Sequence, residues 1–286
     1  MVAPSKLWQV CSCYELCHTW NSSCVGATLD VAKASYRYSF RTYALFYLVS
    51  TLIFHRGIPS IKKLILDILR STNFLAANAI VFMSSICLFR KVLGRFYTGF
   101  AFVPATFASG VAISLEQKSR RPTLALYMAT LSVSCLLRWL RDRDSPIHGL
   151  IAGGVAGTSS IFFRSTTISL YFASKVIESL LIKGQERGIV PVIPRAESIL
   201  YAIATATVLN AGVYEPHNIR PAYWSFLLNL TGSYYGKMNR MLIAHLGTGA
   251  TKLYPDWPVY ADASRLNLID KDGLCARSLQ PPSQGV

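Results

Sequence analysis

The sequence predicts an all-α fold: a multi-spanning helical membrane protein with tandem glycine-rich helical hairpins. Hydrophobic residues make up 52% of the 286 residues, charged residues only 15%, and the mean hydropathy is +0.34. Soluble domains carry about 25% charged residues. Several apolar runs approach the ~20 residues that a helix needs to cross a bilayer. The third observation is a sequence pattern around Arg120 that occurs again around Arg164, which indicates that one helical hairpin is duplicated.

The net charge of +15 is concentrated in residues 1–145, which carry 17 Lys and Arg against 6 Asp and Glu. The cations stand in short clusters between apolar runs, such as Arg90, Lys91 and Arg95. Basic clusters that flank apolar helices bind anionic lipid head groups and influence topology. We therefore expect the lipid bilayer as the partner and no nucleic acid. Both sides of the spans are basic, so the charges predict no orientation.

The N-terminal half divides into a Cys-rich region at 1–35 and a membrane region at 36–137. The apolar run 42–54 is short for a span and is expected to extend back past Arg41. Residues 58–70 place apolar side chains at helical spacing, which predicts an amphipathic helix at the membrane interface. Packing of that helix on other protein helices is the alternative. The spans predicted next are 72–89, 96–115 with a kink at Pro104, and 122–137.

The C-terminal half follows a charged linker at 138–148. Residues 149–251 form a glycine-rich membrane region, and residues 252–286 are a polar tail expected outside the membrane. Residues 222–230 are too short to cross unaided, and their aromatic residues favour the interface. The spans predicted in this half are 149–163, 166–182 and 198–214.

The repeat aligns two units without a gap. Each unit predicts a helix rich in small residues, a basic turn and a second helix with the pattern T-x-x-L-Y-x-A. Chance matching of apolar sequence is the alternative. The matched turn and second-helix residues are Arg120, Thr123 and Tyr127 in the first unit, and Arg164, Thr167 and Tyr171 in the second.

The second unit opens with Gly149, Gly153, Gly154 and Gly157. The spacing fits neither the dinucleotide-binding G-x-G-x-x-G pattern nor a P-loop, which needs a lysine after its last glycine. Glycines four apart lie on one helix face and let another helix approach closely. We therefore predict a helix-packing face here, against the alternative of a membrane helix that merely tolerates glycine. The helix-packing residues predicted in the first unit are Ala108, Gly110 and Ala112.

Lys175 and Glu178 lie one helical turn apart in the predicted span 166–182. Ionisable groups inside a span usually face the bundle or water. One interpretation is a polar seam that lines a solute path. The other, which we favour, is a structural pair that reaches the interface close to Lys183.

The N-terminal region concentrates side chains that can bind metals: Cys11, Cys13, Cys17, His18 and Cys24. Thiolates and imidazoles bind zinc, but their spacing is not a standard set of C-x-x-C pairs, so no metal site is assigned. A disulfide, free thiols and acylation are the alternatives. Cys87 and Cys135 lie in predicted spans and are interpreted as small apolar residues.

The sequence predicts neither catalysis nor a cofactor. Its 5 histidines are dispersed without an H-E-x-x-H motif, and no G-x-S-x-G occurs. Acidic residues are scarce and lie mostly in loops. We therefore expect a protein that is not an enzyme.

Several stretches resemble the transmembrane protein 135 family. They include the C-terminal segments 151–175, 220–231 and 238–250 and an N-terminal signature, CYELCHTWNSSC. The matching signature residues are Cys13, Tyr14, Glu15, His18, Thr19, Trp20, Ser23 and Cys24. Longer members have additional central spans, so this chain is similar to a short member that lacks a central segment. A distant resemblance to the superfamily of mitochondrial inner-membrane preprotein translocase channels rests on Tyr127, Arg138, Asp142, Gly149 and Gly153.

The family resemblance implies a multi-pass protein of mitochondrial or peroxisomal membranes. It implies regulation of the balance between mitochondrial fission and fusion, of peroxisome organisation and of lipid metabolism. The mitochondrial fission machinery and a second copy of the chain are the expected protein partners. The alternative functions are a channel or carrier for small metabolites or lipids and a translocase-like assembly partner.

Overall fold

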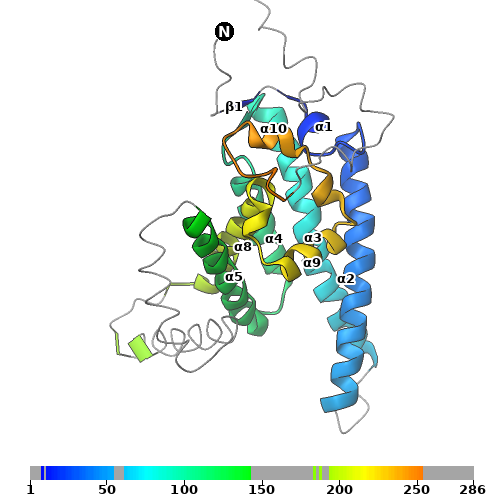
Figure 1. Cartoon of the computed structure of the whole chain (residues 1–286). Helices are drawn as coiled ribbons and strands as arrows, with labels where there is room; N and C mark the ends of the chain where they lie inside the picture. The colour runs from blue at the N-terminus through cyan, green and yellow to red at the C-terminus, as the bar shows by residue number, and fades with distance from the viewer. Residues whose placement is uncertain are drawn as a thin grey trace, which may run out of the picture.

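The computed structural model describes residues 8–9, 11–54, 61–142, 183–184, 187–188 and 193–253. Within these ranges the protein is almost entirely helical, which confirms the predicted fold class (Figure 1). The long helices are α2 (Cys24–Phe54), α3 (Ile61–Leu93), α4 (Phe102–Leu115), α5 (Arg121–Asp142) and α8 (Ala196–Tyr214). The short helices are α1 (Cys13–Leu16), α9 (Pro221–Leu230) and α10 (Arg240–Ala244), with 3-10 turns η1 (Lys118–Arg120), η2 (Pro216–Asn218) and η3 (Tyr234–Lys237). Strands β1 (Trp8–Gln9) and β2 (Phe96–Tyr97) pair antiparallel beside them.

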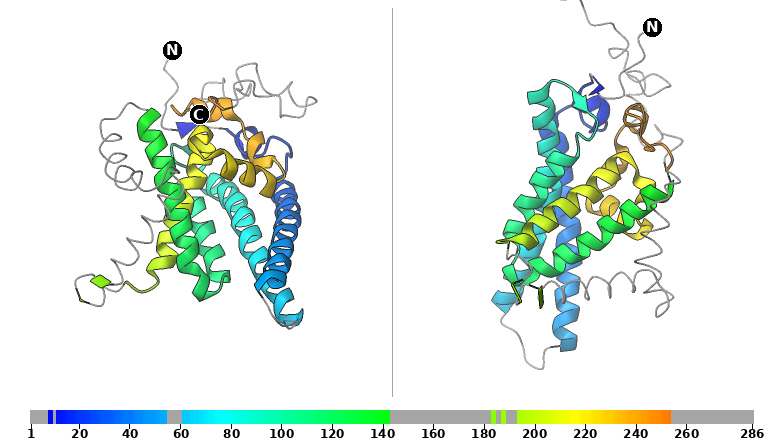
Figure 2. Two further views of the ribbon diagram at one scale, coloured as in Figure 1. Left: turned by 60° about the horizontal axis from the view of Figure 1, so that its bottom comes forward. Right: turned by 90° about the vertical axis from the view of Figure 1, so that its left-hand side faces the viewer.

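The long helices form a curved row in the order α2, α3, α4, α8 and α5, each packed on the next (Figure 2). Helix α9 crosses the concave side of this row. Its Phe226 ring lies 6.0 Å from the ring of Tyr38 in α2, and its Tyr223 hydroxyl lies 3.8 Å from the sulfur of Met128 in α5. Helix α9 therefore joins the two ends of the row and closes it around a shared interior.

Three of the described helical segments are long and apolar enough to cross a bilayer. They are Ile61–Leu93, Lys118–Leu140 and Ala196–Tyr214, with mean hydropathies of 1.6, 1.4 and 1.3. Helix α4 has only 14 residues, and at 1.5 Å per residue it is about 21 Å long, less than the ~30 Å of a bilayer core. The predicted span 198–214 coincides with α8.

Helix α3 joins two segments that the sequence analysis treats separately, the amphipathic stretch 58–70 and the span 72–89. It runs without a break for 33 residues, because residues 61–93 contain no glycine or proline to end it. The apolar side chains of its first turns, including Ile65 and Leu69, remain exposed. The described part of the protein does not cover this apolar face.

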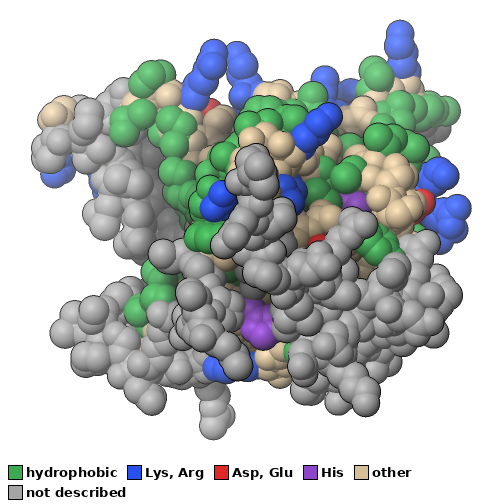
Figure 3. All heavy atoms as spheres, turned by 90° about the horizontal axis from the view of Figure 1, so that it is seen from above, with side chains coloured by type: hydrophobic (Ala, Val, Ile, Leu, Met, Phe, Trp, Pro, Cys, Tyr) green, Lys and Arg blue, Asp and Glu red, His purple; other side chains and the backbone are tan. Residues whose placement is uncertain are grey.

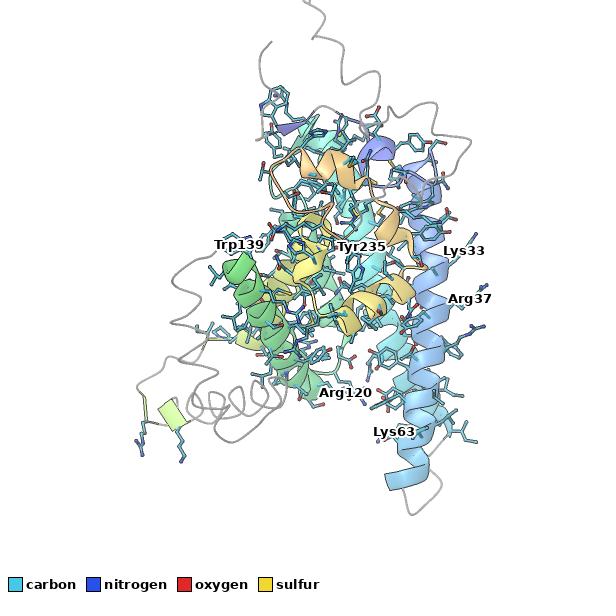
Figure 4. The ribbon with its side chains drawn as sticks, in the orientation of Figure 1. Lys33, Arg37, Lys63, Arg120, Trp139 and Tyr235 are labelled. Carbon is cyan, nitrogen blue, oxygen red and sulfur yellow. The ribbon has the colours of Figure 1, made fainter. Side chains whose placement is uncertain are left out.

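Helix α2 extends the short run 42–54 back past Arg41, as predicted, and continues to Cys24. It therefore passes through the predicted region boundary at residue 35 without interruption. Lys33, Arg37 and Arg41 recur every four residues on its exposed face, and Figure 4 shows Lys33 and Arg37 pointing away from the bundle. This half of α2 is amphipathic, whereas the half after Arg41 exposes Leu45, Phe46 and Val49.

The prediction of one span over 96–115 with a kink at Pro104 is wrong. Phe96 and Tyr97 form β2, and Gly99 turns the chain with a φ of +81°, a conformation that glycine adopts without strain. Helix α4 begins only at Phe102. Pro104 lies in its first turn, where the backbone amide that proline lacks has no partner within the helix, so a kink is not required.

The first predicted hairpin is correct in its helix–turn–helix order and wrong in its packing. Helix α4 ends at Leu115, η1 forms the turn, and α5 begins at Arg121. However, α8 lies between them: α4 packs on α3 and α8, and α5 packs mainly on α8. Thus α8, from the C-terminal half, lies beside α4 at the position where a simple hairpin would place α5. The second predicted hairpin lies outside the described residues.

Candidate functional site: an apolar cavity beneath a cysteine-rich cap

One end of the bundle is closed by a cap, which we define as residues 11–24 together with residues 234–244. The main-chain N–H of Asn239 donates to the carbonyl of Leu16 at 2.9 Å, and its side-chain amide donates to the carbonyl of Glu15 at 3.0 Å. The Thr19 hydroxyl donates to the carbonyl of Lys237 at 2.8 Å. These bonds join two stretches more than 200 residues apart, both of which carry the family resemblance.

The local structure of the cap explains several residues of the N-terminal signature. Ser12 and Glu15 form a reciprocal capping box at the start of α1, which satisfies two amides of its first turn. The Trp20 ring stacks on Tyr234 with centroids 4.7 Å apart. Glu15 and Trp20 therefore have structural contacts that hold the cap together, while Tyr14 is half-buried.

Arg240 anchors the cap to the bundle. Its side chain is 0% exposed, and Nη1 donates to the carbonyls of Gly212 at 2.9 Å and Val213 at 2.7 Å. Those carbonyls belong to the last turn of α8, where no intrahelical donor is present and the helix dipole is negative. Nη2 donates to the carbonyl of Tyr235 at 2.7 Å. The guanidinium thus neutralises the end of α8, a role that the sequence analysis did not identify.

An apolar cavity of about 160 Å³ lies beneath the cap. Its walls come from α2, α3, α5, α8 and α9, and the cap contributes Cys17, Trp20, Tyr234, Tyr235 and Met238. Aromatic side chains dominate the lining, among them Phe74, Phe82 and Tyr235. Figure 4 shows Tyr235 inside the bundle, between the helices. The cavity is thus bounded by residues from both halves of the chain.

Tyr235 and Asn78 place polar groups at the cavity that have partners within the protein. The Tyr235 hydroxyl donates to the carbonyl of Leu209 at 2.6 Å, and burial raises its pKa above the ordinary tyrosine value. The Asn78 side-chain amide lies 3.5 Å from the Tyr201 hydroxyl. On the α5 side, Tyr127 lines the cavity and is 54% exposed, so the cavity reaches the surface there. An apolar ligand could enter at this point.

A cluster of metal-ligating side chains lies within the cap. The ligand atoms of Cys13, His18, Cys24 and Cys87 are all within 4.8 Å of one another. Cys87 comes from α3, and its interpretation as a merely small apolar residue omits this contact. Because α2 and α3 run antiparallel on either side of residues 55–60, residues at similar distances from that connection meet. Cys24 and Cys87 lie at similar distances from this connection, so the sequence spacing was a signal that they could meet.

The thiols of the cap differ in their pKa values. The hydrogen bond from Cys87 lowers the pKa of Cys13 to about 5, and His18 lowers it further against the opposing effect of burial. Burial raises the pKa of the neighbouring Cys17 well above its usual value. The cluster thus holds the pKa of Cys13 below the ordinary thiol value, whereas the pKa of Cys17 lies above it.

The remaining predicted site residues of the first repeat unit have different environments. Ala108 and Ala112 are fully buried, but a Cβ placed on Gly110 would meet open space, so Gly110 is not part of a packing face. Arg120 donates to the Tyr47 hydroxyl and to Ser71 Oγ, joining the turn to α2 and α3. Thr123 is exposed. The predicted residues outside the described ranges are Gly149, Gly153, Gly154, Gly157, Arg164, Thr167, Tyr171, Lys175 and Glu178.

The face seen from above, over the cap, carries more Lys and Arg than Asp and Glu among its described side chains (Figure 3). Hydrophobic side chains lie between these cations. Such a mixture suits contact with anionic lipid head groups. The described surface thus agrees with the bilayer environment that the apolar helices indicate.

An apolar bundle with three helices able to cross a bilayer defines the chain as a multi-pass membrane protein. Residues 10–140 match the family model for the N-terminal cysteine-rich region of Transmembrane protein 135. This match includes the N-terminal part of the cap and the helices from α2 to most of α5. The match covers slightly less than half of the chain and relates residues 10–140 to the transmembrane protein 135 family. No solved structure matches it.

Proposed function

We propose that this protein is a non-enzymatic membrane protein that binds an apolar lipid group in the cavity beneath its cap. Through this ligand it regulates lipid metabolism, peroxisome organisation and the balance of mitochondrial fission and fusion, in mitochondrial or peroxisomal membranes. The cavity, which is apolar and reaches the surface at Tyr127, is the observation that supports lipid binding. The family resemblance supports the organelle and the cellular role.

The chemistry of the lining favours a lipid over an ion or a polar metabolite. Among the described residues that line the cavity, none is Asp, Glu, Lys or Arg. A charged solute would lose its hydration without an opposite charge to replace it, which costs several kcal/mol. An acyl chain or a small ring system, in contrast, gains about 25 cal/mol for each Å² of apolar surface removed from water.

The size of the cavity limits the ligand. An engineered apolar cavity of about 150 Å³ stays dry and admits benzene, and the cavity beneath the cap, at about 160 Å³, is of comparable volume. The cavity therefore accommodates part of a lipid, such as a segment of an acyl chain or a ring. The rest of the molecule would extend past Tyr127 into the bilayer.

A lipid carrier is the second candidate, and the same opening at Tyr127 favours it. In that case the cavity would exchange its ligand with the bilayer, and the purified protein would accelerate lipid transfer between vesicles. A channel for polar metabolites receives no support from the apolar lining. The fission machinery and a second copy of the chain are the protein partners that we include in the proposal, and cross-linking in intact membranes tests them.

The cellular part of the proposal is tested in a null cell line by rescue with variants of α3. Ala79 lines the cavity, so Ala79→Phe would fill it with a ring. Ala77, two residues earlier on the same helix, does not line the cavity, and Ala77→Phe is the matched control. We expect loss of the protein to alter mitochondrial length, and the wild type and Ala77→Phe to restore it. Ala79→Phe should fail to restore mitochondrial length, even when the variant is present in the membrane at the same level as the wild type.

Unchanged mitochondrial and peroxisomal morphology in the null line would contradict the cellular role. Full rescue by Ala79→Phe would contradict the role of the cavity. Imaging of the tagged variants, with protease protection to establish topology, ensures that a failed rescue does not reflect a failure to reach the membrane.

A further inference from the structure

The four side chains of the cap cluster already lie close to the geometry of a tetrahedral metal site. Their ligand atoms are all within 4.8 Å of one another, and His18 Nε2 lies 3.3 Å from Cys24 Sγ. Around zinc, with Zn–S near 2.3 Å and Zn–N near 2.0 Å, ligand atoms are separated by about 3.5–3.8 Å. Small side-chain rotations would therefore bring all four onto one ion.

The imidazole of His18 is oriented for such a role. The ring is fully buried, and Nδ1 lies 2.7 Å from the main-chain carbonyl of Asn21. A carbonyl oxygen only accepts, so Nδ1 carries the proton and Nε2 presents its lone pair to the cysteines. Histidines that bind metals typically hold the other ring nitrogen in a hydrogen bond of this kind.

The turn that supplies this carbonyl is itself fixed. The Asn21 side chain donates to Asp30 Oδ2 at 3.1 Å and accepts from the main-chain N–H of Ser23 at 3.0 Å. Gly26 leaves the space that Asn21 occupies, since a Cβ there would lie 2.6 Å from Asn21 Nδ2. The chain thus orients His18 through neighbours that bind no metal themselves.

The chemistry of the four ligands selects the metal. Three thiols and one imidazole form one of the ligand sets of structural zinc sites, in which protein atoms occupy all four positions. A disulfide would use two of the three cysteines and leave the third beside His18 without a shared role.

The positions of the ligands show what the metal would hold together. Cys13 and His18 belong to the N-terminal part of the cap, Cys24 begins α2, and Cys87 lies near the end of α3. Their neighbours Cys17 and Ile86 line the apolar cavity. An ion bound by all four would fasten the cap to both helices at the edge of the cavity.

We propose that Cys13, His18, Cys24 and Cys87 form a structural zinc site that fastens the cap of this protein to helices α2 and α3. The site goes beyond the proposed lipid function and does not depend on it. Its ligands are three residues of the N-terminal signature and one cysteine 63 residues beyond Cys24.

The test is the metal content of the full-length protein, purified in detergent without chelators under reducing conditions. We expect about one zinc per chain by elemental mass spectrometry. Cys87→Ser and His18→Ala should lose it. Cys135→Ser, at another buried cysteine of the bundle, should retain it. His18→Cys supplies a fourth thiolate and should also retain zinc, which separates ligation from a general packing effect.

Cobalt provides a second readout on the wild-type protein. Growth with Co²⁺ should produce the visible d–d bands and the near-ultraviolet thiolate-to-metal bands of a tetrahedral sulfur-rich site, and Cys87→Ser should abolish them. The proposal is overturned by wild-type protein with neither zinc nor cobalt bands, or by undiminished zinc in Cys87→Ser. A disulfide among Cys13, Cys24 and Cys87 in the native protein would also overturn it.

Discussion

The cap and the bundle beneath it are held together by different kinds of contact. In the cap, directional hydrogen bonds such as those of Asn239 and Thr19 join segments distant in sequence. In the bundle, small side chains such as Ala105 and Ala108 and the aromatic side chains around the cavity provide the contacts. Buried polar bonds favour one arrangement because each unsatisfied group is costly. Apolar packing tolerates alternative arrangements of the side chains. We therefore infer that the cap holds one fixed arrangement, whereas the side chains of the bundle can rearrange to accommodate a ligand.

The cavity lowers the stability of the bundle when it is empty. A closed cavity left by side-chain truncation costs about 24 cal/mol for each Å³, so a volume of about 160 Å³ would cost at most on the order of 4 kcal/mol if left unfilled, and less where it opens at Tyr127. This is a large part of the 5–15 kcal/mol that stabilises an ordinary domain. A ligand that fills the cavity would recover much of that stability, which supports the proposal that a lipid occupies it.

The largest effect is expected where the cap meets the bundle. Arg240→Met preserves most of the side-chain volume but removes three charge-assisted hydrogen bonds, two of them to the last turn of α8. Hydrogen bonds to charged groups contribute about 1.5–3 kcal/mol each. After allowance for the relieved burial of the charge, we expect the free energy of unfolding to fall by about 3 kcal/mol or more. The midpoint of thermal unfolding in detergent measures it.

Arg240→Lys is the matched variant, because it keeps the charge but cannot reproduce the planar fork of donors. The midpoint of thermal unfolding of Arg240→Lys should lie between those of the wild type and Arg240→Met. Thermal stability of Arg240→Met equal to that of the wild type would show that the cap is not anchored through this residue.

A smaller effect, with opposite signs at two glycines, is expected inside the helices. In α8, a Cβ on Gly212 would lie 2.8 Å from Tyr235 Cε1, and the hydrogen bond to Leu209 holds that ring in place. Gly212→Ala should therefore destabilise the protein by about 1–3 kcal/mol through overpacking. Thermal unfolding in the same detergent is the measurement.

Gly110 in α4 provides the comparison, since a Cβ there meets nothing within 4 Å. Gly110→Ala should leave stability unchanged or raise it by up to about 1 kcal/mol, because alanine is the better helix former. Destabilisation by both substitutions to the same extent would refute the distinction between a tightly packed and an open glycine.

The sequence predicts the helices well where the pattern is local. Apolar runs of sufficient length predict α8 and the apolar part of α3, and the continuation of α2 past Arg41 follows from the absence of glycine or proline between Gly26 and Phe54. The same criterion fails at residues 96–101, because apolar composition alone does not distinguish a strand and a turn from the start of a helix. Gly94, with positive φ, follows the end of α3, and Gly99, also with positive φ, turns the chain between β2 and α4.

Contacts between distant segments are the part that the sequence does not predict. The N-terminal signature identifies His18 and Trp20, but nothing in it points to Asn239 or Tyr234 as their neighbours across the cap. The interpretation of Cys87 as a small apolar residue rests on its own helix alone, although Cys24, which it meets, lies on the neighbouring helix α2. Arg240 resembles any exposed basic residue in sequence, and only the fold places it against the end of α8.

The central claim, that the cavity beneath the cap holds a lipid, is tested most directly by photo-crosslinking in native membranes. A photoreactive fatty acid should label cavity residues such as Met83 and Tyr235 in the wild type and in Ala77→Phe. In Ala79→Phe the labelling at these residues should fall about tenfold, equivalent to a loss of about 1.4 kcal/mol of binding free energy. Labelling that is confined to exposed residues, or that is equal in Ala79→Phe and Ala77→Phe, would contradict the claim.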